Sequence, residues 1–154
     1  MNNLDETDKQ ILKMLQANSK LTTKELAAQV NLSPTPVFER LKRLEKEGYI
    51  RKYSAILDNE KVCQGIVVYC NIRLKQHNRE YGTDFINAIQ SLEEVTECYN
   101  ISGDFDFMMK IYVPSMKYYQ DFVLNKLGTI DSIGSLHSVF VLAEVKNSFS
   151  IPVQ

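Results

Sequence analysis

The sequence predicts an α+β protein in two parts: a three-helix helix-turn-helix, with a possible wing, and then a βαββαβ sandwich of the ferredoxin-like kind. Three observations support this. Apolar residues recur at helical spacing through residues 5–47, and at strand spacing, interrupted by two helical stretches, from residue 65 onward. The charge balance also changes between the two parts. We expect a domain at 1–53, a linker strand at 54–64 and a second domain at 65–154.

Composition and charge narrow the function. The chain of 154 residues is 44% hydrophobic and 24% charged, as in soluble globular proteins, and its net charge is −1. Residues 20–52 carry eight Lys or Arg against four Glu, which leaves +4, whereas residues 61–154 carry eight basic and ten acidic residues, which leaves −2. A local basic section of this kind is typical of a nucleic-acid module joined to another domain.

Several classes of protein are disfavoured. No apolar run approaches the roughly 20 residues of a membrane-spanning helix. The polar N-terminus lacks a signal pattern, so we expect a cytoplasmic protein. Cys63, Cys70 and Cys98 form no CxxC pair, and His77 and His137 lie far apart, so we expect reduced thiols and no metal site.

The first two helices carry start signals. Asp5 is a candidate N-cap for a helix over residues 5–17. Thr22 and Glu25 have the spacing of a capping box, in which each side chain binds the other residue's backbone amide. A tight connection at Asn31 and Leu32 leads to the third helix.

The third helix begins with two prolines. Ser33 is a candidate N-cap whose hydroxyl accepts a first-turn amide, and Pro34 and Pro36 fall at N1 and N3, where the amides have no intrahelical partner. Gly48 ends the helix. The expected common core of the three helices is Ile11, Leu15, Leu26, Val30, Leu32, Val37, Leu41 and Leu44.

Two short helices joined by a tight turn, the second of them basic, are typical of a DNA-binding helix-turn-helix. We assign Thr35, Phe38 and Glu39 to base edges. Arg40, Lys42 and Arg43, on the same outward face, reach bases or phosphates, so Arg43→Ala should weaken binding and lower its salt dependence. The alternative is a solvated charged face. The full candidate set is Thr22, Thr23, Ser33, Thr35, Pro36, Phe38, Glu39, Arg40, Lys42, Arg43, Lys46 and Arg51.

After Gly48, the segment 49–57 alternates well enough for a short strand or wing. The second part then reads as strand, helix, strand, strand, helix, strand, which is the ferredoxin-like order. Its first helix should bury Phe85, Ile86 and Ile89, and its second should start at Ser115 and end with Gly128 as C-cap. Two helices cover one sheet face. The uncovered apolar face predicts association with another copy.

The segment "SGDFDF" (102–107) places two carboxylates between strands. Asp104 and Asp106 suggest an acid/base pair or a cation site, but a polar turn in which the aspartates satisfy their own backbone explains them better. The residues alone therefore favour a turn.

Four segments, "LDETDKQIL", "LSPTPVFERLKRLEKEGYI", "SGDFDFMMK" and "VFVLAEVK", resemble the leucine-responsive regulatory protein (Lrp/AsnC) family of prokaryotic transcription regulators. The resemblance implies dimers paired through their sheets, higher assemblies up to octamers, and an amino acid effector between dimers, here leucine or methionine. It implies no cofactor beyond this effector. The implied pocket residues are Gly103, Asp104, Asp106, Ser135, His137, Ser138 and Val139.

The resemblance changes the interpretation of the two aspartates. A carboxylate can pair with the effector's ammonium, and backbone amides near Gly103 can hold its acid group. We therefore favour effector contact by Asp104 or Asp106, without deciding between them. In "SLHS" (135–138), serine and histidine replace threonines that are frequent in the family.

Two alternatives remain at this point. The first is an architectural protein that compacts DNA without any ligand. The second is an enzyme, because some relatives of this architecture resemble porphyrin-modifying decarboxylases. Such an enzyme needs general acids, for which His137 is the one candidate, and the chain keeps a full basic third helix.

Overall fold

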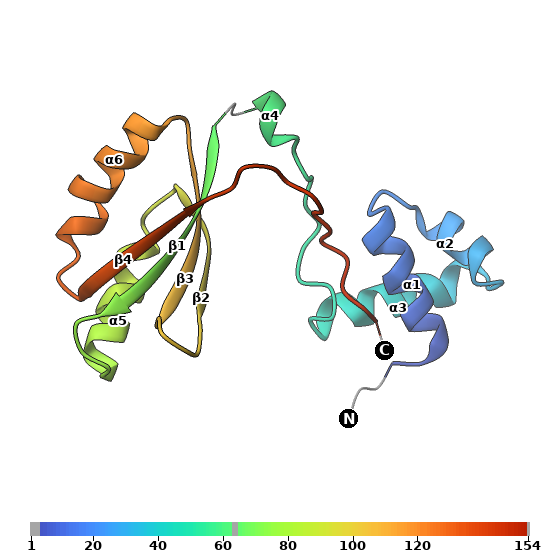
Figure 1. Ribbon diagram of the computed structural model, residues 1–154. Helices are drawn as coiled ribbons and strands as arrows, with labels where there is room; N and C mark the ends of the chain where they lie inside the picture. Colours follow the sequence, from blue (N-terminus) through green and yellow to red (C-terminus); the bar gives the residue numbers. More distant parts are fainter. Residues whose placement is uncertain (1–3, 63–64, 154) are drawn as a thin grey trace. The chain divides into compact units, whose positions relative to one another are not determined.

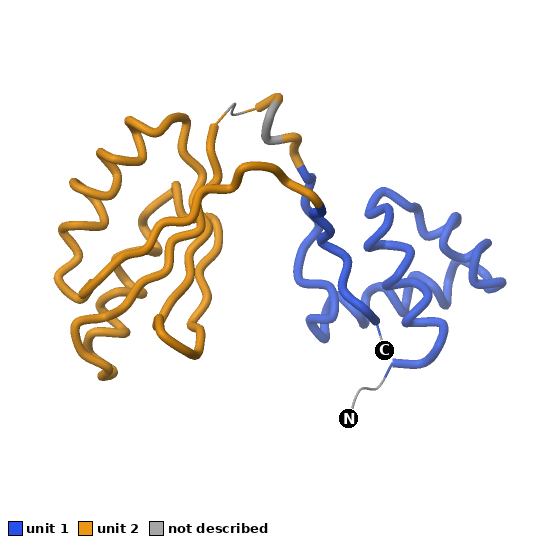
Figure 2. The backbone as a smooth tube through the Cα atoms, in the orientation of Figure 1, with its two compact units in different colours: residues 1–56, 146–154 blue, residues 57–145 orange. Residues whose placement is uncertain are grey.

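The structure is a computed structural model, and it describes residues 4–62 and 65–153. The chain divides into two compact units: Met1–Ile56 with Lys146–Gln154, and Leu57–Val145 (Figure 2). The boundary at 56/57 falls inside the expected linker. The C-terminal tail differs from expectation, because residues 146–154 group with the first unit and not with the second.

Three helices form the first unit: α1 (Glu6–Ala17), α2 (Thr23–Gln29) and α3 (Pro34–Lys46) (Figure 1). Both predicted starts are confirmed. The Asp5 carboxylate accepts the Asp8 amide at 2.8 Å. The capping box at α2 is complete, with the Thr22 amide 2.7 Å from a Glu25 carboxylate oxygen, and this hydrogen bond lowers the pKa of Glu25.

The start of α3 differs from expectation. Ser33 is the N-cap, but its hydroxyl makes no capping hydrogen bond. In α1 and α2 the cap side chain accepts the amide at N3. At α3 the N3 residue is Pro36, which has no N–H, so the usual donor is missing. The helix accommodates both prolines, but Pro36 removes the N–H group that the Ser33 hydroxyl would have accepted.

The core of the first unit lies where the three helices meet. Ile11, Leu26, Val37 and Leu44 are fully buried there, and Val30 and Leu41 pack at its edge. Leu32, expected in the core, is 39% exposed. It lies in the turn after Asn31, whose φ is 54°, and helical periodicity does not set side-chain direction in a turn.

The connection between the units contains no strand among its described residues. Residues 51–58 have no regular secondary structure, and a short helix, α4 (Asn59–Val62), follows. Of the short strand or wing predicted at 49–57, the strand is therefore not formed. Alternation supplies suitable side chains, but a strand also needs a neighbouring backbone to bind its amides and carbonyls. Cys63, at the end of the expected linker, lies outside the described residues.

The second unit has the predicted βαββαβ order. Its elements are β1 (Ile66–Leu74), α5 (Arg79–Ile89), β2 (Val95–Asn100), β3 (Phe107–Val113), α6 (Met116–Asn125), a 3₁₀ turn η1 (Leu127–Thr129) and β4 (Ile133–Phe140). The four antiparallel strands lie in the order β2-β3-β1-β4. Both long helices lie on one face of this sheet (Figure 1).

The core of the second unit fills the space between sheet and helices. Alternate residues of β1 and β3 point into it, and the Phe85 ring of α5 lies 4.6 Å from the ring of Phe107. Ile86, expected to be buried, is 41% exposed. Successive helical residues are about 100° apart, so the narrow face that buries Phe85 and Ile89 leaves Ile86 at its margin.

The end of α6 also differs from expectation. Its C-cap is Lys126, and Gly128 lies inside the 3₁₀ turn without a positive φ. The 3₁₀ turn continues the chain without a left-handed residue, so no glycine cap is required. Gly128 is instead tightly placed, because a Cβ there would lie 3.0 Å from the Val123 carbonyl oxygen.

The second face of the sheet carries an apolar and aromatic set with one ion pair. Lys110 Nζ lies 3.3 Å from Glu97 within it. No described element of the second unit covers this face. Its large side chains, by strand register, are Val67, Tyr69, Tyr99, Met108, Tyr112 and Val139.

Candidate functional site

The exposed face of α3 is a narrow stripe. Phe38 is 46% exposed, and the Lys42 ammonium lies 5.6 Å from the centre of its ring. Thr35, Glu39 and Lys46 are exposed on the same side of the helix. A protruding aromatic ring beside two lysines and short polar groups can contact both base edges and phosphates. This stripe contains five of the twelve predicted DNA-contact residues.

Two predicted DNA contacts are placed differently. Arg40 and Arg43 are half-buried and turn toward α1, so their assignment to the outward face is wrong. Arg40 Nη1 lies 2.7 Å from Asp8 Oδ1 and 2.5 Å from Asp5 Oδ2, and Arg43 Nη2 binds Asp8 Oδ2. The two arginines were predicted as DNA contacts because they are positively charged. Their carboxylate partners lie more than thirty residues upstream, so no local sequence pattern reveals the pairing.

The pairing has an electrostatic consequence. The hydrogen bonds that Arg40 and Arg43 donate to the Asp8 carboxylate raise the pKa values of both arginines, so their positive charge is stabilised. The Asp8 side chain is 1% exposed. A buried carboxylate needs such partners. The charge of the two arginines is therefore already balanced inside the unit.

The other predicted DNA contacts lie outside the α3 stripe. Ser33, Pro36 and Arg51 are exposed, and Thr23 is half-buried at the first position of α2. The Thr22 hydroxyl is engaged in the capping box, 2.8 Å from Glu25. Lys24, which the sequence analysis left out of the set, is exposed one residue after Thr23 and is a further basic group at the start of α2.

Asp106 is tied into the sheet. Its Oδ2 accepts the Leu74 amide at 2.8 Å, and its Oδ1 lies 2.7 Å from His77 Nδ1. Its backbone amide donates to the Ile72 carbonyl oxygen at 2.8 Å. The Asp106 side chain is only 15% exposed. Both carboxylate oxygens thus fasten the loop before β3 to the end of β1.

Asp104 differs from Asp106. It is exposed, and among the described residues its carboxylate has no partner. Its backbone carbonyl oxygen accepts from Arg73 at 2.8 and 2.6 Å, and the Arg73 guanidinium lies 5.7 Å from the Phe105 ring centre. Gly103 supplies a φ of 113°, which side-chain-bearing residues rarely adopt. No local sequence pattern singles out Arg73, because its contact with the loop depends on strand pairing.

The β4 candidates divide between the two faces of the sheet. Pairing with β1 places Ser135 opposite Arg73, His137 opposite Asn71 and Val139 opposite Tyr69, on the uncovered face. The His137 ring lies 6.1 Å from that of Phe105, so this end of β4 meets the "SGDFDF" loop. The structure thus brings His137 and the loop together.

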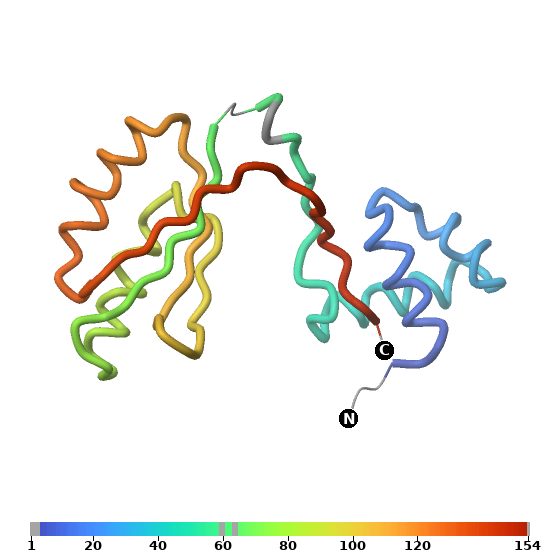
Figure 3. Tube along the Cα trace, viewed as in Figure 1, coloured from blue at the N-terminus to red at the C-terminus, as the bar shows by residue number. Residues whose placement is uncertain are grey.

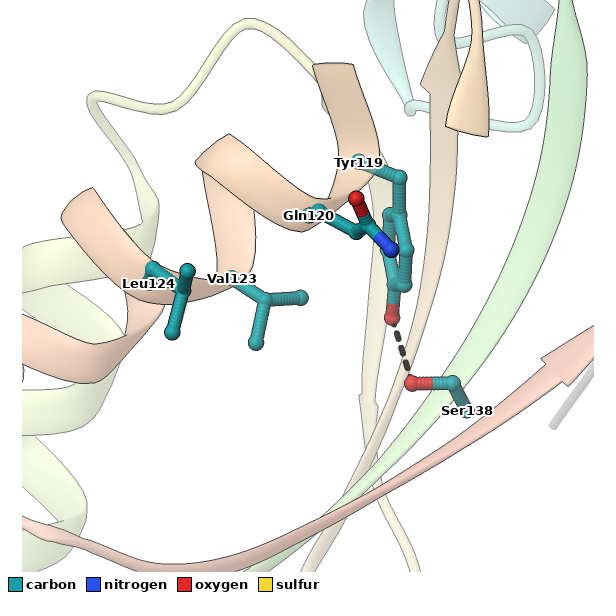
Figure 4. A pocket seen from close by; sticks show the side chains of 5 residues that line it. All are labelled: Tyr119, Gln120, Val123, Leu124 and Ser138. Carbon is teal, nitrogen blue, oxygen red and sulfur yellow. Dashed lines mark hydrogen bonds between the residues drawn. The ribbon is translucent and has the colours of Figure 1, made fainter. Parts of the chain in front are cut away.

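Ser138 points to the opposite face. Its hydroxyl lies 2.6 Å from that of Tyr119 on α6, beside a shallow pocket of about 330 Å³ whose other walls are Gln120, Val123 and Leu124 (Figure 4). Burial raises the pKa of Tyr119 to about 12 and that of the neighbouring Cys70 to about 11, so both stay protonated at neutral pH. Ser138 is therefore separated from the other loop and β4 candidates.

Among residues 4–62 and 65–153, no group of three or more His, Cys, Asp or Glu side chains is arranged to hold a metal ion. No helix in these ranges is both long and apolar enough to cross a membrane.

A winged helix-turn-helix followed by a βαββαβ unit defines a class of DNA-binding transcription regulators with a ligand-binding domain. Residues 4–51 match the winged helix-turn-helix DNA-binding family, and residues 67–151 match the Lrp/AsnC ligand binding domain. The chain belongs to the Lrp/AsnC family of transcription regulators. This family consists of DNA-binding regulators, which sets the enzyme alternative aside.

Relatives and solved structures agree with this assignment. The leucine-responsive regulatory proteins of Klebsiella pneumoniae and Escherichia coli K12 are each 36% identical over 145 residues, covering 94% of this chain and 88% of theirs. A transcriptional regulator of Neisseria meningitidis, crystallised with L-methionine, is 34% identical with a TM-score of 0.92 over 97% of both chains. An AsnC family regulator of Agrobacterium tumefaciens is 33% identical, with a TM-score of 0.90 over 97% of both chains.

Proposed function

We propose that this chain is a sequence-specific regulator whose DNA binding or assembly responds to a free amino acid, with leucine or methionine as the expected effector. The observation that carries the proposal is the pairing of an exposed recognition stripe on α3 with a polar loop around Asp104 in a ligand-binding fold. The choice of effector is supported by the L-methionine bound to the Neisseria regulator and by the names of the leucine-responsive relatives.

The DNA-binding part of the proposal rests on the exposed stripe of α3. Phe38 and Thr35 face base edges, while Lys42 and Lys46 neutralise phosphates. A recognition helix usually places the residues near its N-terminus against the bases. Pro34 and Pro36 leave fewer amides for phosphate at this helix start, so side chains carry the anchoring.

The effector part assigns the ammonium contact to Asp104. The carboxylate of Asp106 already binds the Leu74 amide and His77, and giving these up would leave a partly buried amide unpaired. The exposed carboxylate of Asp104 has no such competitor among the described residues. His137, on the same face as the Arg73–Phe105 pair, contributes to the wall of the site.

Assembly follows from the uncovered sheet face. Burying Tyr69, Tyr112 and Val139 against a second copy removes apolar area from water, which stabilises a dimer and places two α3 helices in one particle. An effector shifts such an assembly only if it binds its states with different affinity. We therefore propose that effector binding regulates DNA binding by changing the assembly or the spacing of the α3 helices.

The DNA-binding proposal is tested by mobility shift with the DNA upstream of this chain's own gene and a shuffled duplex of the same length. We expect salt-sensitive binding that prefers the upstream fragment. Equal binding to both duplexes, combined with no response to any amino acid, would instead favour an architectural role. No binding at low salt would refute the DNA-binding proposal.

The effector proposal is tested by comparing melting temperature and assembly mass with each of the twenty amino acids. We expect leucine or methionine to shift one or both in the wild type, and Asp104→Ala to abolish the shift. Asp84→Ala, which removes an exposed carboxylate from α5, is the matched control and should leave the shift intact. A response that persists in Asp104→Ala contradicts the assignment of that contact.

A further inference from the structure

One buried carboxylate joins the first helix to the recognition helix. Asp8 is 0% exposed, and each of its oxygens has a partner on α3: Oδ1 binds Arg40, and Oδ2 binds Arg43. Oδ2 also accepts the Asp5 amide at 3.2 Å. The carboxylate thus lies between two guanidinium groups and one backbone amide, and its hydrogen-bonding capacity is largely used.

The two arginines flank the recognition stripe. Residues three apart lie on one side of a helix, so Arg40 and Arg43 form one row, while Phe38, Lys42 and Lys46, which recur every four residues, form the neighbouring row. Holding the first row against α1 fixes how far α3 is rotated about its own axis. The rotation in turn decides which residues face outward.

We propose that Asp8 is the positioning residue of the recognition helix, and that Arg40 and Arg43 remain bound to it on DNA and neutralise no phosphates. This inference rests on the proposed DNA-binding function. It reverses the expectation from sequence that Arg43 anchors the phosphate backbone. Asp8 itself contacts no base. Its ion pairs set the rotation of α3, so that the row containing Phe38 and Lys42 faces the bases.

Arg40 and Arg43 should remain bound to Asp8 in the DNA complex because this carboxylate is buried. Transferring either guanidinium to a phosphate would leave a charged carboxylate in the interior with one partner fewer, and an uncompensated buried charge is strongly unfavourable. Lys42 and Lys46 have no such commitment. They are exposed, and the described charged partner of Lys42 is Glu45, one helical turn away at 3.6 Å. The lysines, not the arginines, are free to exchange partners.

The test is the salt dependence of binding to the upstream DNA. Each phosphate neutralised adds about 0.9 to the slope of log K against log salt concentration. We expect Lys46→Ala to reduce this slope by about 0.9. Arg43→Ala should leave the slope unchanged while weakening binding to the upstream fragment. A loss of about 0.9 in the slope for Arg43→Ala would overturn the proposal.

A double-mutant cycle separates positioning from a merely structural role. Preference for upstream over shuffled DNA is measured in Asp8→Asn, Arg43→Gln and the double variant. If Asp8 acts through Arg43, each single variant lowers the preference for upstream DNA. The double variant should then lose no more of this preference than the single variant with the larger loss. Additive losses, or an unchanged preference despite a lower melting temperature, would refute positioning.

The two proposals fail in distinguishable ways. A wild-type protein without salt-sensitive binding to the upstream fragment refutes the proposed function. A wild type that binds, combined with an Arg43→Ala variant of reduced slope, refutes only the role of Asp8. If Asp8→Asn does not fold, the slopes of Arg43→Ala and Lys46→Ala still decide the question, since both residues are at least partly solvent-exposed.

Discussion

Asp104 and Asp106 lie two positions apart, yet their surroundings give them different tasks. Asp106 fastens a loop through the Leu74 amide and His77, whereas Asp104 leaves its carboxylate exposed and uses its backbone carbonyl to hold Arg73. The carboxylate of Asp106 does not satisfy the backbone of its own turn, as the turn interpretation expected, but that of Leu74 on β1. Effector contact by Asp104 stays a prediction.

Stability distinguishes the two residues. Asp106→Ala removes the acceptor of a part-buried amide, and we expect it to lower the free energy of unfolding by about 1–3 kcal/mol. Asp104→Ala should change it by less than about 0.5 kcal/mol, because that side chain is exposed. Chemical denaturation of both variants without effector checks this. Equal losses would show that Asp104 also has a structural task.

At the residue scale, the sequence predicted which side chains are candidates for a site better than it predicted which residues they contact. The loop aspartates, the lysines of α3, the Asp5 cap and the capping box of α2 follow from local spacing. The pairs Arg40–Asp8 and Arg73–Asp104 do not, because they join residues more than thirty positions apart. His137 and Ser138 are consecutive in β4, so alternation already places them on opposite faces, but which of the two lies on the side of the loop depends on strand register.

At the element scale, periodicity predicted all the main helices and strands of both units, and the errors lie at their ends. Ser33 loses its capping bond because of Pro36, and Gly128 is not a cap because a 3₁₀ turn extends α6. The expected linker strand is absent at residues 51–58, which have no regular secondary structure, because alternation supplies side chains but not the ladder of backbone hydrogen bonds that a strand needs. Periodicity therefore locates the elements, whereas their ends depend on local details such as the missing N–H of Pro36.

Two glycines of the second unit should respond oppositely to alanine. Gly82 lies inside α5 with open space at its Cβ position, so Gly82→Ala should stabilise the protein by about 0.5–1 kcal/mol. A Cβ on Gly134 would lie 3.0 Å from the Lys75 amide nitrogen, next to the register shift at Arg73/Leu74, so Gly134→Ala should cost about 1–3 kcal/mol. Thermal unfolding measures both, and shifts of the same sign would contradict the packing described here.

At the scale of the whole molecule, the tail is the feature that the domain prediction missed. Figure 3 traces the chain from β4 through residues 141–145 into the segment that belongs to the first unit. The Gln16 side chain of α1 accepts the Ile151 amide at 2.7 Å and donates to its carbonyl oxygen at 3.1 Å. A pairing over 135 positions is invisible to any local pattern.

The tail contact gives a test of its own. Gln16→Ala removes both hydrogen bonds to Ile151, and we expect the free energy of unfolding of the first unit to fall by about 1 kcal/mol. Exchange of the Ile151 amide with deuterium should become faster. Gln10→Ala, an exposed glutamine of the same helix, is the matched control. Unchanged exchange in Gln16→Ala would show that the tail is held by other contacts.

The same contact orders events on the ribosome. Helices α1 to α3 are synthesised first, but the partner of Gln16 follows 135 residues later. At about 5–20 residues per second, the first unit waits roughly 7 to 27 seconds for Ile151, and the whole second unit emerges in the interval. The three helices of the first unit therefore form their contact with the tail only after the second unit has been synthesised. In a chain that terminates before Ile151, the first unit lacks these two hydrogen bonds and is less stable.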